Sequence, residues 1–231
     1  MSYIEIHVIV EGQTEQTFIR EVLAPNLASQ SIFLQAHLIG KVGHKGGAIS
    51  FERAKKDIGN YLKQRPDTYI STMFDYFRID SDWPGLERIM RQVKTGQNLT
   101  AEEKAKILEN ATFEQIQQAY PKFQVKKRFI PYISMHEFEA LLFSNAKILA
   151  DKINSPVQGI NNILANHNHQ PEEINNTPKN APSKQIERLT TSYRKVFMGK
   201  VISEAIGIPT IRDKCPHFDS WLNKLENLKK R

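Results

Sequence analysis

Hydrophobic and polar positions along the first 145 residues fall into segments typical of a strand and then of a helix, in repeated alternation. The stretch 3–10 (YIEIHVIV) is short and rich in β-branched residues, as buried strands are. The stretches 31–39, 68–74 and 128–135 are also predicted to be strands. Strands that alternate with helices favour a parallel sheet, so the pattern predicts an α/β fold with about four mainly parallel strands flanked by helices.

Residues suited to helix ends stand between these strands. Thr14 is placed to cap a helix after the first strand, and Ser50 a helix that stops before Pro66. Thr100 is followed three positions later by Glu103, which is the spacing of a capping box. The stretch 136–143 (HEFEALLF) is predicted to turn helical after the fourth strand.

The sequence changes character after about residue 145. The stretch 154–183 is rich in asparagine and proline, which is typical of a loop-rich connector. Helical patterns return at 183–197 and 199–206, and the stretch 219–231 reads as a basic amphipathic helix. We therefore expect an α/β domain over residues 1–150, followed over residues 151–231 by the connector and a helical subdomain packed on it.

Charge and composition narrow the class of protein. The 231 residues carry 32 basic and 25 acidic side chains, a formal charge of +7. Such a balance suits a nucleic-acid partner, although a basic surface also serves solubility. The single cysteine excludes a disulfide framework, and no apolar run approaches the roughly 18 residues of a membrane span. With no leader-like N-terminus, we expect a cytoplasmic protein without a membrane partner; assembly into a homo-oligomer is left open.

Acidic side chains follow the predicted strands at the ends where functional groups of a parallel sheet gather. Glu11 and Glu15 follow the first strand, Asp75 ends the third, and Glu137 and Glu139 follow the fourth. Like charges this close repel one another unless a cation lies among them. Oxygen ligands without cysteine favour Mg²⁺ or Mn²⁺.

Some of the polar residues near these strand ends have a simpler interpretation. Asp82 precedes Trp83-Pro84 and is predicted to cap the next helix. His136 at a strand–helix junction is more often a structural histidine than a base or ligand. Glu11 and Asp75, by contrast, end apolar strands and have no evident capping or solubility role, so they are the firmest site candidates.

Three ordered motifs carry a family resemblance: VEGQTE at 10–15, TMFDYF at 72–77 and HEFEALLF at 136–143. They resemble the Toprim fold of topoisomerases, primases and overcoming-lysogenisation-type nucleases. With the stretches 180–189 and 211–226, the chain is similar to an uncharacterised bacterial Toprim-like family, domain of unknown function 4276 (DUF4276). Genes of that family often stand beside one for an AAA-type ATPase.

The resemblance implies roles for the matching residues. Glu11 matches the Toprim glutamate, which acts as a metal ligand or general acid/base, and Glu15 matches the second acid of the overcoming-lysogenisation-type version. Asp75 matches the first aspartate of the Asp-x-Asp motif, but Phe77 stands where the second would be. Glu137 or Glu139 could supply the missing ligand. Asp80 and Asp82 are the other acids considered for this role.

These features predict a metal-dependent nuclease or nucleic-acid-processing subunit acting on DNA or RNA. The family resemblance implies an ATPase partner and a role in a bacterial anti-phage defence system. Glu11, Asp75 and Glu137 would act in catalysis through two-metal chemistry. Lys184 is the preferred cation beside the scissile phosphate, because it lies in a family-like stretch; its alternative is a surface lysine. Two rivals remain: a non-catalytic binding module of an ATPase complex, favoured by Phe77, and a phosphoesterase acting on nucleotides.

A glycine-rich loop at 40–47 offers Lys41, His44 and Lys45 to a nucleic-acid backbone, or is simply a long turn. It lacks the Gly-Lys-Ser/Thr ending of a phosphate-binding P-loop. No cofactor other than Mg²⁺ or Mn²⁺ is therefore predicted.

Overall fold

A computed structural model of the chain describes residues 3–40, 49–174 and 177–229. Within them a sheet of five parallel strands lies at the centre, in the order β2-β1-β3-β4, with β5 also paired to β3. The strands are β1 (Ile4–Val10), β2 (Ile32–Leu38), β3 (Tyr69–Asp75), β4 (Phe129–Ile130) and β5 (Ile133–Ser134). The predicted α/β fold with a mainly parallel sheet is confirmed.

The last predicted strand is interrupted. The stretch 128–135 forms two short strands, β4 and β5, separated by Pro131 and Tyr132. Proline has no N–H to donate to a strand ladder. Here the Thr72 side chain takes the place of the backbone hydrogen bonds between the strands. Its hydroxyl donates to the Tyr132 carbonyl and accepts from the Tyr132 N–H, both at 3.0 Å. The prediction of one continuous strand here was wrong.

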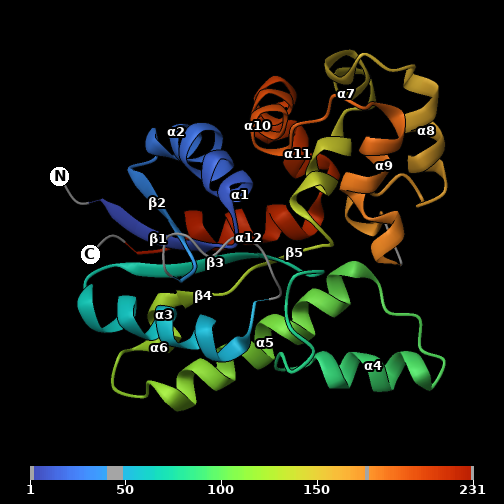
Figure 1. Cartoon of the computed structure of the whole chain (residues 1–231). Coiled ribbons are helices and arrows are strands. Elements are labelled where there is room, and N and C mark those ends of the chain that lie inside the picture. The colour runs from blue at the N-terminus through green and yellow to red at the C-terminus, as the bar shows by residue number, and fades with distance from the viewer. Residues whose placement is uncertain (1–2, 41–48, 175–176, 230–231) are drawn as a thin grey trace.

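Helices cover both faces of the sheet (Figure 1). One face carries α3 (Phe51–Gln64), α5 (Ala101–Ala119) and α6 (Val125–Arg128), with α4 (Leu86–Lys94) packed on α5. The other face carries α1 (Gln13–Phe18), the π-helical turn η1 (Ile19–Leu23), α2 (Ala24–Ala28) and α12 (Pro216–Glu226). Alternating residues of β1 serve the two layers, since Val8 and Val10 belong to the core under α1, and Ile9 to the core under α3.

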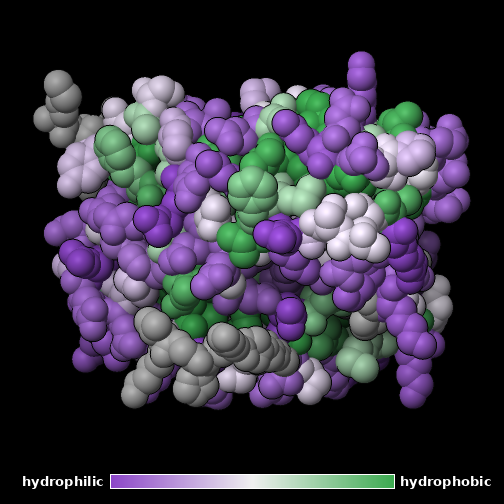
Figure 2. Space-filling model, turned by 45° about the horizontal axis from the view of Figure 1, so that its top comes forward, coloured by the Kyte–Doolittle hydropathy of each residue, from purple (hydrophilic) through white to green (hydrophobic). Residues whose placement is uncertain are grey.

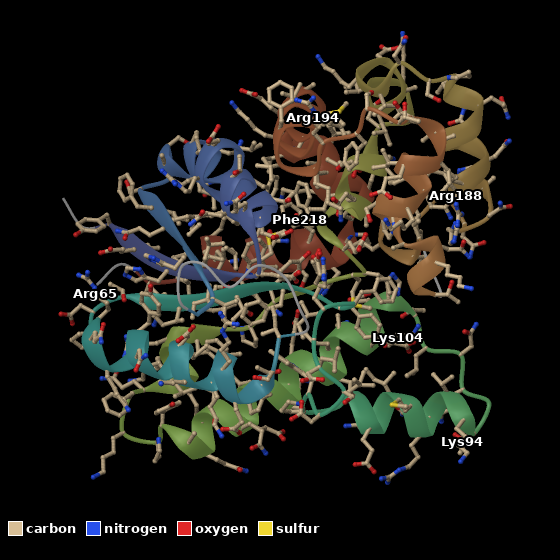
Figure 3. The ribbon with its side chains drawn as sticks, in the orientation of Figure 1. Arg65, Lys94, Lys104, Arg188, Arg194 and Phe218 are labelled. Atoms are coloured by element: carbon tan, nitrogen blue, oxygen red, sulfur yellow. The ribbon has the colours of Figure 1, made fainter. Side chains whose placement is uncertain are left out.

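The C-terminal half is helical. Its elements are η2 (Phe138–Ser144), α7 (Ala146–Ile153), α8 (Val157–Ala165), η3 (Pro171–Glu173), η4 (Pro178–Asn180), α9 (Pro182–Leu189), α10 (Lys195–Ile206), α11 (Ile208–Lys214) and α12. Phe218 of α12 lies in the interior of the molecule (Figure 3). Trp221 of α12 donates to the Ser71 hydroxyl on β3 at 2.9 Å. Apolar side chains from β1 to α12 form one buried cluster. The boundary near residue 150 between an α/β domain and a helical subdomain stays a prediction.

Helix starts test the predicted caps. Ser50 accepts from the Arg53 N–H, and Thr100 forms its capping box with Glu103, as predicted. Two other caps were wrong: α1 begins directly after Gly12, so Thr14 lies inside the helix, and α4 begins after Gly85 instead of Asp82. Gly85 has a φ of +89°, which glycine adopts without strain and which turns the chain just before the helix. Among the described helices, none has the length and apolarity that crossing a membrane requires.

Candidate acidic active site

Parallel pairing brings the ends of β1 and β3 together. Val10 lies opposite Met73, so Glu11 and Asp75 leave the same edge of the sheet. The Asp75 N–H donates to the Glu11 carboxylate at 3.3 Å. The Asp75 carboxylate in turn accepts from the Phe138 N–H at 2.9 Å, at the start of η2. Hydrogen bonds therefore tie together the three segments that the motifs singled out.

Glu15 joins this group from the first turn of α1. Its side chain is buried, and its carboxylate accepts from the Gly12 N–H at 2.9 Å. A Cβ atom at Gly12 would lie 3.1 Å from that same carboxylate oxygen, closer than side chains usually approach. The glycine of the VEGQTE motif thus lets the Glu15 carboxylate turn back toward the end of β1.

Glu137 and Glu139 complete the acidic edge, which we define as Glu11, Glu15, Asp75, Glu137 and Glu139. The Glu137 carboxylate accepts from the Ser183 N–H at 3.1 Å, at the start of α9. Glu139 is almost fully buried, with 3.2 Å between its carboxylate and the Lys195 ammonium of α10. The Tyr193 hydroxyl donates to the same Glu139 oxygen at 3.4 Å.

Burial and mutual repulsion raise the pKa values of these acids. Burial raises the pKa of Glu11 to about 8, with Glu15 adding to the effect and Arg78 opposing it. Burial also raises the pKa of Glu139 to about 7 against the pull of Lys195. The pKa of Asp75 lies well above its usual value, because the group is buried and faces Glu15 and Glu11. Burial raises the pKa of Glu15 in the same direction. The edge therefore favours taking up positive charge, either protons or a cation.

Two cations at the edge were missed from the sequence. Arg78 lies 3.2 Å from the Glu11 carboxylate and is partly exposed. Burial lowers the pKa of Lys195, but Glu139, Glu137 and Asp75 together raise it above its ordinary value. The predicted cation, Lys184, lies on α9 with an exposed side chain paired to Glu187 at 2.6 Å. The only hint of Lys195 in the sequence is that it follows the family-like stretch at 180–189 by a few residues.

The residues around Phe77 form an aromatic wall beside the acidic edge. Phe77 stacks on His136 with ring centroids 5.2 Å apart, and Tyr76 meets the same imidazole edge-on. Burial lowers the pKa of His136 to about 3, so its ring is neutral. Phe77 therefore packs where a second aspartate would stand, and the interpretation of His136 as structural fits this packing.

The other candidates lie apart from these contacts. Asp80 accepts from the Ser81 N–H, and Asp82 is exposed in the same loop. Lys41, His44 and Lys45 fall outside the described residues. Within residues 3–40, 49–174 and 177–229, no three acidic, histidine or cysteine side chains converge closely enough to hold a metal ion as they stand.

The sequence also matches a known protein family. A family model described as a domain of unknown function, DUF4276, matches residues 10–226. The chain belongs to the DUF4276 family. The family predicted from the motifs is thereby confirmed, and the matched segment of this DUF4276 chain contains the whole acidic edge.

A solved structure to which the DUF4276 chain is similar is the C-terminal region of the Burkholderia pseudomallei OLD protein. The two are 15% identical, with a TM-score of 0.41, over 96% of this chain and 99% of that one. No curated protein matches this chain.

Proposed function

We propose that this protein is a metal-dependent nuclease, or the nucleic-acid-processing subunit of a larger nuclease, with a Toprim-like acidic site. One observation carries the proposal: acids from the ends of β1, β3 and β5 lie buried together, and their pKa values rise because of burial and one another. Carboxyl groups gathered in a buried site repel one another and are costly to desolvate, and enzymes place perturbed carboxyl groups where chemistry occurs.

The donor chemistry fits a hard divalent cation. The acidic edge offers carboxylate oxygens without cysteine, which suits Mg²⁺ or Mn²⁺. Glu11, Glu15 and Asp75 would hold the ion, with Glu137 or Glu139 supplying the oxygen that Phe77 does not. Because no three of the described donors converge unaided, the ion would draw the carboxyl groups together.

The side chains themselves suggest a division of work. When bound, a divalent ion would supply water activation and stabilise charge on the phosphate. Without the ion, Glu11, whose pKa is about 8, would hold a proton at neutral pH, and it would release that proton on binding the ion. Lys195 would place positive charge beside the phosphate from its position on Glu139, the role that the sequence assigned to Lys184. Arg78, partly exposed beside Glu11, would orient the entering phosphate.

Partners follow from charge and family. A formal charge of +7 suits DNA or RNA, and the family resemblance implies an AAA-type ATPase partner in anti-phage defence. We therefore include an ATPase-linked defence role in the proposal.

A second function is favoured by one specific observation. Phe77 and His136 fill the place of a metal-binding aspartate with a neutral aromatic stack. This arrangement would suit a module that binds nucleic acid without cleaving it, while the ATPase partner does the work.

The test compares wild type with Glu11→Gln and Asp75→Asn, and uses Asp82→Asn as the exposed-acid control. Calorimetric titration with Mn²⁺ should give binding in wild type and Asp82→Asn and little in the other two. Labelled DNA and RNA strands should be cleaved with Mn²⁺ and left intact in EDTA. Metal-free nucleic-acid binding without metal uptake would instead select the binding module.

A further inference from the structure

A groove beside the acidic edge has no role in the site described above. It has a volume of about 320 Å³ and runs between α7 and the start of α10. Its walls are Lys152, Ser192, Arg194, Phe197, Met198, Val201 and Ile202. We call it the α10 groove. Its volume is at the small end of the range for ligand pockets, roughly 300 Å³ and above.

The aromatic ring in this groove is unusually open. The Phe197 side chain is 66% exposed, although full exposure of a phenyl ring leaves a large apolar area in water. On the face that Figure 2 shows, the coloured hydrophobic residues gather in small groups bordered by hydrophilic ones. Apolar side chains of Met198, Val201 and Ile202 line the groove with Phe197, and Lys152, Ser192 and Arg194 supply its polar part. The groove is small compared with the broad apolar patch of a stable protein interface.

Two cations line the groove together with this ring. Lys152 and Arg194 are exposed, and neither forms an ion pair with another described residue. Arg194 lies at the start of α10, on the periphery of the molecule (Figure 3). An aromatic ring between unpaired cations is the combination with which proteins hold single-stranded nucleic acid: the ring stacks on a base, and the cations contact phosphates.

The groove is joined to the acidic edge by one short segment. Tyr193 and Lys195 direct their polar atoms to Glu139, whereas Arg194 between them lines the groove. On α10 itself, Gly199 faces Phe138 and Thr14, and Phe197 faces the groove. The groove and the acidic edge are therefore joined through consecutive residues, with Arg194 lining the groove and Lys195 paired to Glu139.

We propose that the α10 groove binds an unpaired base of a single nucleic-acid strand by stacking on Phe197, with Arg194 and Lys152 on the flanking phosphates. This inference rests on the proposed function, because it supplies the substrate class of the same site: a single strand or an unpaired end. A duplex hides the faces of its bases and would lose this contact.

Binding is measured by fluorescence anisotropy with a labelled single-stranded DNA of mixed sequence, in EDTA, so that no cleavage is needed. Phe197→Ala should weaken binding about 10-fold, the size of one lost base stack. Phe197→Leu should weaken it similarly, and Phe197→Trp should keep or improve it. Arg194→Gln should reduce the slope of log affinity against log salt by about 0.7, which is one phosphate contact. Phe33→Ala, a 47% exposed phenylalanine on β2, is the matched control and should bind as wild type does.

A strand with one abasic position in each of several registers identifies the stacking itself. The cost of Phe197→Ala should shrink when the missing base is the one that occupies the groove. Equal affinities of Phe197→Ala and wild type would overturn the inference and leave the groove to a protein partner. Equal losses for single strand and duplex would overturn it as well.

The outcomes separate this inference from the proposed function. Asp82→Asn, which changes an exposed acid outside the acidic edge and the groove, should bind the strand as wild type does. Phe197-dependent binding without any cleavage by wild type would support the groove and count against the nuclease. Metal-dependent cleavage at the same rate by wild type and Phe197→Ala would support the nuclease and count against the role of the groove.

Discussion

Two regions of this molecule bury charge in opposite ways. Arg128 is 2% exposed, and its guanidinium donates to the carbonyls of Thr68, Leu62, Phe123 and Arg65. The acidic edge buries carboxyl groups against one another, and their pKa values rise as a result. The first charge is surrounded by carbonyl acceptors, whereas the acids of the second region face one another, and Arg78 and Lys195 offset only part of the rise in pKa.

The difference separates structure from function. A buried charged group whose N–H groups have hydrogen-bond acceptors holds the neighbouring segments in place. Arg128 joins the end of α3 and the start of β3 to the segment before β4 in this way. A buried group of like charges opposes folding unless something else compensates. A region that buries groups of like charge is therefore the better guide to a functional site.

The largest expected effect is on activity at the acidic edge. Glu11→Gln or Asp75→Asn should lower cleavage at least about 100-fold, since each removes a group from the transition-state environment. Neither change should destabilise the fold, because like charge is relieved and a hydrogen-bond acceptor remains. Cleavage rates and urea unfolding of the same samples measure both. An active Glu11→Gln would end the assignment.

Arg128→Met should do the opposite and lower stability by about 3 to 5 kcal/mol, because several buried carbonyls lose their donor. Urea unfolding measures this change. The control is Arg91→Met, an exposed arginine on α4, which should unfold as wild type does. If Arg128→Met were as stable as its control, satisfied hydrogen bonding would not be what distinguishes the two regions.

The two candidate lysines give a matched pair. Lys195→Met should lower cleavage about 10-fold or more, because Lys195 lies on Glu139 within the acidic edge. Lys184→Met should leave cleavage nearly unchanged, because that side chain is exposed and paired with Glu187. Single-turnover rates at saturating enzyme compare them. The reverse result would restore the role that the sequence assigned to Lys184.

The smallest effect is a pH dependence of stability. Burial raises the folded-state pKa of Glu11 to about 8, above an unfolded value near 4.5. The stability that Glu11 contributes to the folded state is therefore fully present below pH 4.5 and is lost as pH rises through 8. In EDTA, wild-type stability should fall between pH 6.5 and 8, by up to about 1.4 kcal/mol per pH unit from this group.

Glu11→Gln should flatten that slope. His7 and His37, whose pKa values burial lowers to about 4, act with the opposite sign but only below pH 6.5. Burial lowers the pKa of His217, but Glu109 and Glu172 raise it above its ordinary value, so this imidazole adds a slope of the same sign above pH 6.5. The difference between wild type and Glu11→Gln therefore isolates Glu11. Parallel pH profiles of the wild type and Glu11→Gln would contradict the assigned pKa of Glu11.

The local pattern of apolar and polar residues was sufficient to predict much of the fold and part of the site. The stretches around β1, β2 and β3 were predictable because β-branched runs bounded by turns have few other solutions. Glu11 and Asp75 followed from them, since parallel strands end at one edge of a sheet. The break between β4 and β5 was missed because it depends on the hydroxyl of Thr72, a residue on another strand.

The sequence by itself determined the layered α/β fold, the family and the acids at the strand ends, because each is written in residues close together along the chain. Only the tertiary structure decided which cations meet those acids. Lys195 reaches Glu139 from a helix far along the chain, and Lys184, although it lies in a family-like stretch, points to solvent. Such pairings depend on how the C-terminal helices pack against the sheet, and packing contacts between distant segments leave no local pattern to read.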